Sequence, residues 1–157
     1  MELEFRKPTL PEMAKLGKFL TLVKHDYVPP FSDEEKIQEL NDIRKEKTKA
    51  IIAITAEAQI VGYVSWKPYD KDKNYGYMAN IAVHPQWRRK GISTKLRELA
   101  FEEMEKTGFR GVYYTTWHTN TAMVESSRKL GMTVVKVYLD EGFRGTGGKT
   151  ILYRKKF

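Results

Sequence analysis

Residues 83–94 combine the residue types that could bind a diphosphate. Pro85 should end the strand before them, because proline cannot donate to a β-ladder. Residues 88–90 are three cations in a row, and Gly91 would let the backbone approach a bulky anion closely. A helix predicted to begin at Ile92 would present free backbone amides and the positive end of its dipole to that anion. The stretch therefore indicates a site for a diphosphate.

The plainer interpretation is a basic loop that caps an ordinary helix, and a single glycine beside several cations would favour it. The order of strand, proline, cations, glycine, small residue (Ser93) and amphipathic helix favours the phosphate site instead. The helix predicted at 92–106 is amphipathic because one face carries only apolar side chains. These are Ile92, Leu96, Leu99, Ala100 and Met104.

The elements around this turn predict a mixed sheet with helices on both faces. A helix is predicted after Thr9, with an apolar stripe at Met13, Leu16, Phe19, Leu20 and Val23, and a proline pair at 29–30 ends it. Ser32 with Glu35 forms a capping box for the next helix. The apolar stripe of that second helix is expected at Ile37, Leu40 and Ile43. Strands are predicted at 3–7, 50–55, 60–66, 75–83, 112–117, 133–139 and 149–155, a further helix at 121–130, and a charged loop at 68–74. This order favours one α/β (α+β) domain over residues 1–157.

Composition limits the available chemistry. Cys is absent and the three His residues, His25, His84 and His118, are dispersed, so disulfides, thiolate chemistry and a metal site are not expected. No segment approaches about 20 consecutive apolar residues, so we expect a soluble cytoplasmic protein with no membrane partner. The net charge of +8 favours anionic partners, whether nucleic acid or a phosphorylated cofactor, without deciding between them.

The turn resembles the acetyl-CoA-binding motif of the GNAT superfamily of N-acetyltransferases, in which Arg/Gln-x-x-Gly-x-Gly/Ala follows Val-x-Pro. Residues 83–85 and 88–93 match it, with Ser93 in the last small position. A second motif of the family is similar to residues 120–132, where an Asn opens a helix and a Gly closes it. The order of the elements also resembles that family, so the resemblance covers roughly residues 3–157.

The resemblance implies a fold and a co-substrate. The sheet would be mostly antiparallel, with a central parallel pair of strands, 75–83 and 112–117, that splay apart to admit acetyl-CoA. Its pantetheine arm would pair with one strand, its pyrophosphate would bind the amides of the turn, and Asn120 would contact the arm or cap its own helix. The expected cofactor-binding residues are Ile81, Ala82, Val83, Arg88, Arg89, Lys90, Gly91, Ile92, Ser93, Thr94 and Asn120.

The catalytic acid and base follow less directly from the sequence. The family often protonates the leaving thiol with a Tyr four residues before the Gly of the second motif, and Ser127 stands there. Ser127 could relay a proton through water, or could simply be a small residue at a tight contact. Tyr113 and Tyr114, on the strand at 112–117, point to opposite faces, so only one of them can face the cleft, and Tyr114 is the candidate catalytic residue. His118 could deprotonate an ammonium, because imidazole titrates near neutral pH, or could be an ordinary loop residue.

The turn also resembles that of the ribosomal-protein alanine N-acetyltransferases. Their catalytic Glu would fall at Thr115 and their Tyr at Ser127, and the absence of both groups argues against that specificity. An alternative to a catalytic acid and base is that the substrate amine loses its proton to water and that the enzyme acts mainly by positioning the reactants.

Three aromatic residues, Tyr27, Phe31 and Trp66, are candidates for the acceptor pocket, although packing in the core is the alternative for Trp66. The glycine-rich residues 145–150 end like a P-loop. However, Phe143 stands where the first Gly of that motif is required, and a strand follows rather than a helix. We expect a hairpin loop beside the acceptor site instead.

These patterns favour an N-acetyltransferase that moves an acetyl group from acetyl-CoA to a primary amine of a small molecule or protein, by direct attack in a ternary complex. The missing Tyr leaves a non-catalytic acetyl-CoA-binding regulatory module as an alternative. The charge of +8 leaves a basic nucleic-acid-binding protein as a second alternative, although the sequence has no recognition-helix signature. The sequence does not encode the acceptor, and a homodimer stays open.

Overall fold

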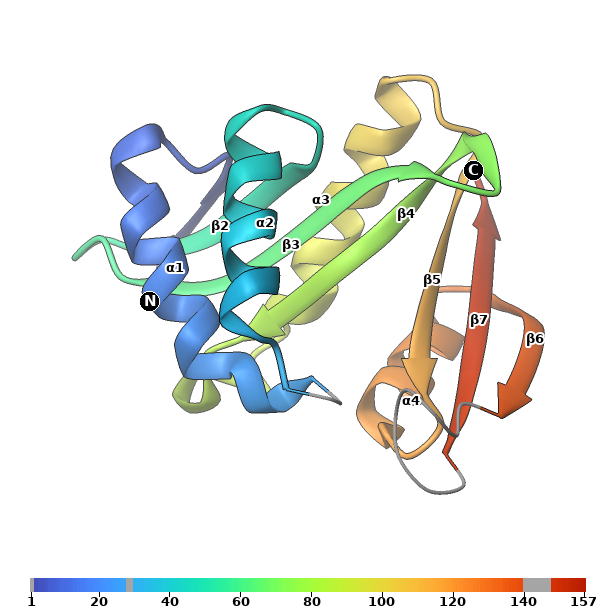
Figure 1. Cartoon of the computed structure of the whole chain (residues 1–157). Helices are drawn as coiled ribbons and strands as arrows, with labels where there is room; N and C mark the ends of the chain where they lie inside the picture. The colour runs from blue at the N-terminus through green and yellow to red at the C-terminus, as the bar shows by residue number, and fades with distance from the viewer. Residues whose placement is uncertain (1, 28–29, 140–147) are drawn as a thin grey trace. The chain divides into compact units, whose positions relative to one another are not determined.

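The chain folds into a mixed α/β arrangement with one seven-stranded sheet (Figure 1). The structure, a computed structural model, describes residues 2–27, 30–139 and 148–157. The strand order is β1-β2-β3-β4-β5-β7-β6, and β4 runs parallel to β5 in a sheet that is otherwise mostly antiparallel. The strands are β1 (Leu3–Arg6), β2 (Lys49–Thr55), β3 (Ile60–Tyr69), β4 (Asp72–Val83), β5 (Gly111–Trp117), β6 (Thr133–Leu139) and β7 (Lys149–Lys156). The helices are α1 (Met13–Val23), α2 (Asp33–Arg44), α3 (Ile92–Lys106) and α4 (Thr121–Lys129), with 3₁₀ turns at Leu10–Glu12, Lys24–Asp26 and Pro85–Trp87. This architecture confirms the predicted fold class.

The chain forms two compact units, and both β4 and α3 contribute to each of them. The first unit contains Met1–Lys67 and Ala79–Glu102, and the second contains Pro68–Met78 and Glu103–Phe157. That both units belong to a single domain stays a prediction.

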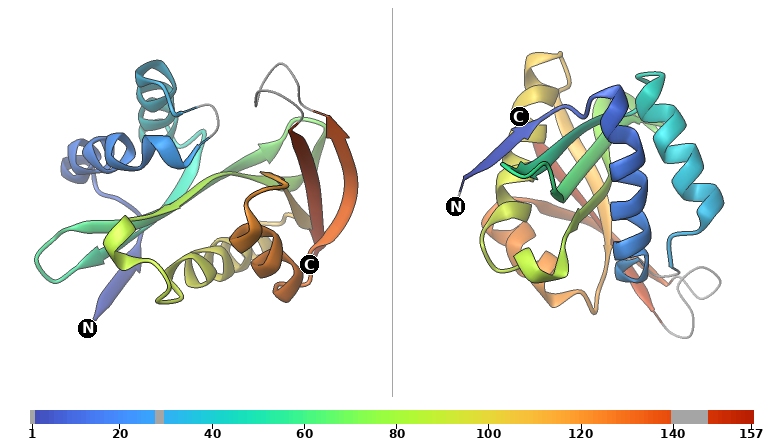
Figure 2. Two further views of the ribbon diagram at one scale, coloured as in Figure 1. Left: turned by 90° about the horizontal axis from the view of Figure 1, so that it is seen from below. Right: turned by 90° about the vertical axis from the view of Figure 1, so that its left-hand side faces the viewer.

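Helices cover both faces of β3 in the first unit. Tyr63 donates a hydrogen bond to Glu39 of α2, so this side chain faces the first two helices. Successive residues of a strand point to opposite faces, and a Cβ on Gly62 would meet Ile92 and Leu96 of α3 at 3.1 Å. Figure 2 shows α1 and α2 side by side on one face and the start of α3 on the other.

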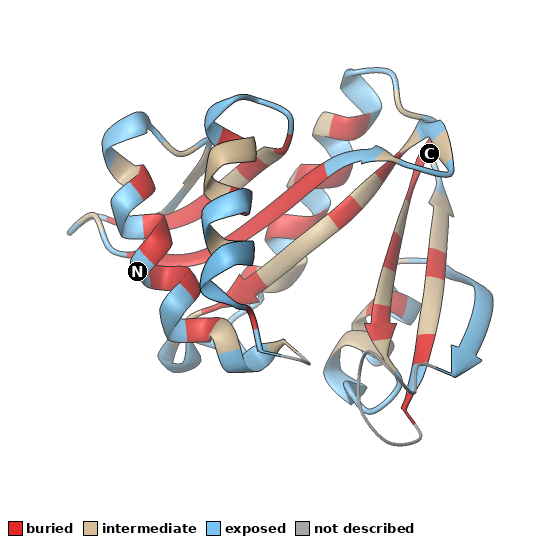
Figure 3. Ribbon diagram, viewed as in Figure 1, coloured by how far each residue is buried: buried red, intermediate tan, exposed pale blue. Residues whose placement is uncertain are grey.

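The predicted apolar stripe of the first helix forms much of the core of this unit (Figure 3). The side chains pack against β2 and β3, where Ile52 and Tyr63 have no solvent exposure. Burial of an aliphatic or aromatic side chain of this size contributes roughly 1.5–3 kcal/mol. The buried residues of α1 are Met13, Leu16, Gly17, Phe19, Leu20 and Val23.

The capping box of α2 is confirmed, but part of its predicted apolar stripe is wrong. Ser32 Oγ accepts from the Glu35 amide, and Glu35 Oε1 accepts from the Ser32 amide, both at 3.1 Å. Ile37, expected on the buried stripe, is 56% exposed, whereas Glu39 is 8% exposed. The buried face runs through Glu39 and Ile43, one turn apart. The proline pair expected before this helix includes Pro29, which lies outside the described residues.

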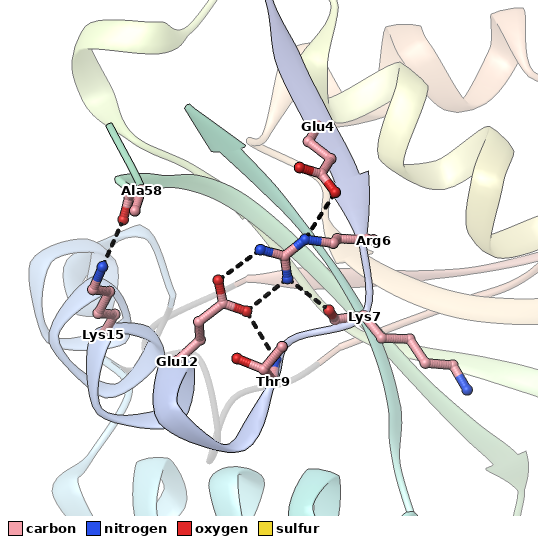
Figure 4. Close-up of polar contacts among 7 residues, drawn as sticks. All are labelled: Glu4, Arg6, Lys7, Thr9, Glu12, Lys15 and Ala58. Atoms are coloured by element: carbon pink, nitrogen blue, oxygen red, sulfur yellow. Dashed lines mark hydrogen bonds and ion pairs between the residues drawn. The ribbon is translucent and has the colours of Figure 1, made fainter. Parts of the chain in front are cut away.

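A charged cluster connects β1 to the turn before α1 (Figure 4). The Arg6 guanidinium donates to both carboxylate oxygens of Glu12, at 2.7 and 2.8 Å. The Thr9 amide donates to the same carboxylate at 2.8 Å. The Arg6 hydrogen bond is the main cause that lowers the pKa of Glu12 to about 2, against the opposing effect of burial.

The predicted charged loop at 68–74 is wrong, because β3 continues to Tyr69 and β4 already begins at Asp72. Tyr69 stacks on Tyr77 across the hairpin, with ring centroids 5.3 Å apart and an interplanar angle of 13°. Such cross-strand aromatic pairs stabilise a sheet. The charged side chains are tolerated because they lie at the exposed tip, where Lys73 Nζ is 3.4 Å from Asp70 Oδ1.

The second unit contains the parallel pairing and the antiparallel ladder β5-β7-β6 (Figure 1). The parallel register joins Gly76 to Val112 and Tyr77 to Tyr113, and extends no further. That these two strands splay apart beyond this point stays a prediction. The remaining predicted elements, 112–117, 121–130, 133–139 and 149–155, are confirmed to within two residues at each end.

Candidate functional site

The turn after β4 has an open, irregular backbone. The strand ends at Val83 and a 3₁₀ turn follows at Pro85–Trp87, as expected from the proline. Arg89 and Gly91 both have left-handed backbone, with φ of 62° and 79°. Apart from Gly91 itself and its neighbours in the chain, no atom of the described residues lies within 4 Å of the position that a Cβ on Gly91 would occupy. The described part of the chain therefore leaves this side of the turn unobstructed.

The backbone amides from Arg88 to Thr94 donate no hydrogen bond to any atom in the described part of the chain. The first intrahelical bond of α3 is donated by the Lys95 amide to the Gly91 carbonyl, at 3.0 Å. Unpaired amides at the start of a helix, together with the helix dipole, attract an anion. The predicted anion site thus has the required run of free donors.

The three cations of the turn do not act alike. Arg88 folds back onto the protein, where its Nη2 lies 2.5 Å from Asp26 Oδ2 and its Nε donates to the Val83 carbonyl at 3.2 Å. Lys90 Nζ lies over the ring of Trp87, 5.9 Å from the centroid. All three cations are expected beside the anion, and Arg88 is the one held to Asp26 and to β4 by hydrogen bonds. A contact of any of the three with a cofactor stays a prediction.

Hydrogen bonds of the backbone tie the end of β4 and the residue after it to their surroundings. Ile81 O accepts a hydrogen bond from the Tyr27 hydroxyl at 3.3 Å. Val61 O accepts from the His84 amide at 2.8 Å. Ala82 and Val83 are buried. These contacts fix the strand segment that the resemblance assigns to the pantetheine arm.

Two of the three candidate catalytic residues lie together in the second unit. Tyr114 of β5 and Ser127 of α4 are both fully buried, and their hydroxyl oxygens are 2.5 Å apart. Tyr113 lies on the opposite face, as expected, where its ring contacts Tyr69 with centroids 4.5 Å apart. The structure therefore places a phenol beside the residue that stands at the usual Tyr position.

The third candidate, His118, is exposed and does not share this contact. Its Nδ1 accepts a hydrogen bond from the Lys149 amide at 3.0 Å, and its own amide donates to the Lys149 carbonyl at 2.9 Å. The imidazole thus ties the end of β5 to the start of β7. Its action as a base stays a prediction.

Asn120 is confirmed as a helix cap. Its Oδ1 accepts from the Met123 amide at 3.2 Å, at the start of α4. A contact with a cofactor stays a prediction.

The aromatic acceptor candidates divide into a pair and a core residue. Tyr27 and Phe31 lie with ring centroids 5.1 Å apart. Trp66 is 2% exposed, which agrees with packing in the core. The loop expected beside the acceptor site, 145–150, lies outside the described residues up to Gly147, and Lys149 begins β7 as predicted.

Sequence reasoning missed Glu39, a buried carboxylate in α2. Its Oε2 accepts three hydrogen bonds, from Ser65 Oγ at 2.6 Å, Asn80 Nδ2 at 2.8 Å and Tyr63 Oη at 3.2 Å. Burial raises the pKa of Tyr63, and the nearby Tyr27 and Glu39 raise it further. The spacing of Glu39 to the buried Ile43, one helical turn later, is the signal that could have identified it.

Within the described ranges, no three His, Asp or Glu side chains gather closely enough to hold a metal ion. In the same part of the chain, no helix is both long and apolar enough to cross a membrane.

Residues 17–132 match the acetyltransferase (GNAT) family. Because this match covers most of the chain, the chain belongs to the acetyltransferase (GNAT) family. The resemblance predicted from the two motifs is thereby confirmed.

The curated relatives are longer proteins. The chain is 33% identical over 79 residues to a mycothiol acetyltransferase of Mycolicibacterium smegmatis, a match that covers 50% of this chain and 24% of that protein. It is 29% identical over 119 residues to a mycothiol acetyltransferase of Mycobacterium sp. (strain JLS), covering 74% and 36% respectively. The matched parts therefore amount to about a quarter to a third of these relatives.

Solved structures share the fold over nearly the whole chain. An N-acetyltransferase from Staphylococcus aureus Mu50 superposes with a TM-score of 0.82 at 13% identity, covering 99% of both chains. A GNAT acetyltransferase from Streptococcus pneumoniae gives 0.80 at 20% identity, covering 99% and 100%. The structure of yncA from Salmonella typhimurium, which contains its cofactor acetyl-CoA, gives 0.81 at 16% identity, covering 99% and 94%.

Proposed function

We propose that this chain binds acetyl-CoA and transfers its acetyl group to a primary amine, by direct attack within a ternary complex. The observation that supports this most strongly is the run of free backbone amides from Arg88 to Thr94. Membership of the acetyltransferase (GNAT) family supports the same activity. The non-catalytic module and the nucleic-acid-binding protein have no comparable support.

The turn would hold the pyrophosphate through its backbone. The amides from Arg89 to Thr94 would donate to the phosphate oxygens, and the side chains of Arg89 and Lys90 would add positive charge. Arg88 would act indirectly, because its contacts with Asp26 and Val83 hold the turn in place. Residues 81–83 of β4 would pair with the pantetheine arm.

Tyr114 would donate a proton to the thiolate that leaves as the carbon–sulfur bond breaks. A phenol is a stronger acid than the Ser127 hydroxyl beside it, and Ser127 would orient the phenol through their hydrogen bond. The acceptor would be a primary amine of a small molecule or of a protein, and Tyr27 and Phe31 would contact it. No metal is required for this chemistry.

A charge introduced into the turn tests the binding claim. Ser93→Asp places a carboxylate among the free amides, so repulsion should weaken acetyl-CoA binding at least about tenfold, or about 1.4 kcal/mol. Calorimetric titration with acetyl-CoA measures this. Gln59→Glu adds the same charge in the exposed turn between β2 and β3 and should leave the affinity within about twofold.

Thiol release from acetyl-CoA with a panel of primary amines then tests transfer. Failure of the unmodified protein to bind acetyl-CoA at sub-millimolar concentration would rule out the proposed function. Tight binding without turnover of any amine would favour the regulatory module.

A further inference from the structure

Glu39 is a buried carboxylate that contacts neither the turn at residues 88–94 nor the Tyr114–Ser127 pair. It is 8% exposed, and no Lys, Arg or His in the described part of the chain lies within 4.0 Å of it. A buried charge without a partner is costly unless hydrogen bonds or a ligand compensate it. The position therefore calls for a specific explanation.

The hydrogen bonds to Glu39 are distributed unequally between its two oxygens. Oε2 receives all three donors, whereas Oε1 accepts no hydrogen bond from any described residue. In the described part of the chain, Trp117 Nε1 is the only fully enclosed polar side-chain atom that lacks a partner. Glu39 Oε1, which also lacks a partner, therefore retains contact with solvent. One oxygen is thus fixed by the protein, and the other is free to receive a donor from outside.

A purely structural role would not require this second oxygen. The three donors, from Tyr63, Ser65 and Asn80, connect α2 to β3 and β4 through Oε2 alone. The single amide oxygen of a glutamine could accept the same bonds. What a glutamine could not supply is a second acceptor that carries negative charge.

The surroundings of Glu39 suit an organic cation that approaches the end of β4. Asn80, which donates to Glu39, directly precedes Ile81, whose carbonyl accepts from Tyr27. The ring of Tyr27 packs against that of Phe31, and aromatic faces attract cations. Tyr27 and Tyr63 are the titratable groups that interact with the carboxylate, and burial raises the pKa of each, so both are neutral at physiological pH.

We propose that the free oxygen of Glu39 binds the ammonium group of the acceptor and receives a proton from it. This inference rests on the proposed function, and it specifies the acceptor as an amine that arrives as a cation. One proton passes from the ammonium nitrogen to Oε1, which leaves a neutral amine. That amine attacks the thioester carbonyl, a carbon–nitrogen bond forms, the carbon–sulfur bond breaks, and the second proton of the nitrogen ends on the CoA sulfur. The proton on Glu39 then leaves to solvent.

Glu39→Gln tests this proposal, because it retains an oxygen for the three donors and removes the charge. Binding of three cationic amines (benzylamine, putrescine and a tetrapeptide with a free N-terminus) is measured by calorimetry on protein saturated with CoA. The variant should weaken binding of the preferred amine at least about tenfold, while acetyl-CoA affinity changes by less than about twofold. Glu34→Gln, which removes an exposed carboxylate from the same helix, is the matched control and should change neither affinity.

The pH profile separates proton acceptance from a structural role. In the unmodified protein, kcat/KM for the preferred amine should fall towards low pH, because only an ionised carboxylate can accept a proton. Glu39→Gln should lose this limb of the profile and lower kcat/KM by about a hundredfold or more. A variant that keeps the limb, or that binds the amine as well as the unmodified protein does, overturns the proposal.

Two further outcomes are distinguishable. If the protein binds acetyl-CoA but none of the three cations, the proposed role of Glu39 fails and the proposed function stands. If acetyl-CoA itself does not bind, the proposed function fails. Should Glu39→Gln lower the unfolding temperature and the affinities for acetyl-CoA and amine together, the carboxylate is structural and the proposal is overturned.

Discussion

The hydroxyl of Tyr114 lies 2.5 Å from the hydroxyl of Ser127, and both side chains are fully buried. Ser127 stands at the position where the family often has the Tyr that protonates the leaving thiol. The phenol that is missing from α4 is therefore present one hydrogen bond away, on the neighbouring strand β5. A proton donor from a different element can serve the same purpose, because catalysis depends on where the group lies and not on its place in the sequence.

Replacement of this phenol should affect turnover more than binding. We expect Tyr114→Phe to lower kcat by about a hundredfold, since general acid catalysis contributes on the order of 10²–10⁴. The KM for acetyl-CoA should change little, because the ring and its packing against Tyr153 are retained. Steady-state thiol release measures both constants.

Tyr113→Phe is the matched control, because it removes the same hydroxyl from the other face of the same strand. It should leave kcat within about twofold. Ser127→Ala should give a smaller loss than Tyr114→Phe if Ser127 only orients the phenol. Equal losses in Tyr113→Phe and Tyr114→Phe would contradict the assignment of the acid.

The ion pair between Arg6 and Glu12 should make stability depend on pH (Figure 4). The pKa of Glu12 is lowered to about 2 in the folded protein, whereas a Glu in an unfolded chain titrates near about 4.3. The contribution of the pair is therefore complete above about pH 4.5 and decreases as pH falls towards 2. Urea unfolding from pH 2 to 7 measures this dependence.

Glu12→Gln should remove that acid-dependent part of the stability. Because Arg6 is partly exposed, we expect a cost of about 1 kcal/mol at pH 7 and almost none near pH 2. Lys73→Ala, which breaks an exposed pair with Asp70, should cost a few tenths of a kcal/mol at most. A Glu12→Gln cost that is the same at both pH values would refute the linkage.

The parts of this structure that depend on local sequence could be predicted. The stripe from Met13 to Val23, the capping box at Ser32 and the turn at Gly91 each involve residues within a few positions of one another. Helical periodicity, side-chain caps and glycine conformation act over that range. These signals were sufficient to predict most of the elements and the irregular turn before α3.

The parts that could not be predicted depend on residues distant in sequence. Asp26 and Arg88, which pair, are 62 positions apart, and Glu39 receives donors from residues 24 to 41 positions later. Stacking of Tyr69 on Tyr77 extends a hairpin that the charged residues between them concealed. No local pattern indicates which distant partner a buried polar group will find.

Gly111, at the start of β5, should tolerate no side chain. A Cβ there would lie 2.2 Å from the Lys155 carbonyl oxygen and 2.6 Å from the Tyr75 ring. The first contact is with backbone, which cannot rotate away, so Gly111→Ala should lower the free energy of unfolding by about 1–3 kcal/mol or more. Urea denaturation monitored by circular dichroism measures the loss.

Gly17→Ala provides the contrast in a helix. Its Cβ would meet only the end of the Leu40 side chain, at 3.3 Å, and alanine favours a helix over glycine by roughly 0.5–1 kcal/mol. We expect a change near zero or a small gain in stability. A loss in Gly17→Ala as large as that in Gly111→Ala would show that the close backbone contact is not the cause.

Capping of α4 and binding of the cofactor are two separable roles of Asn120, and one pair of substitutions distinguishes them. The structure shows the cap, in which Oδ1 accepts from the Met123 amide. Asn120→Ala removes this acceptor and should cost about 1 kcal/mol of stability, whereas Asn120→Asp keeps an acceptor and should restore it. If capping is the whole role, Asn120→Asp should bind acetyl-CoA within about twofold of the unmodified protein. An Asn120→Asp variant that is stable but binds acetyl-CoA much more weakly would show that the amide nitrogen of Asn120 also serves the cofactor.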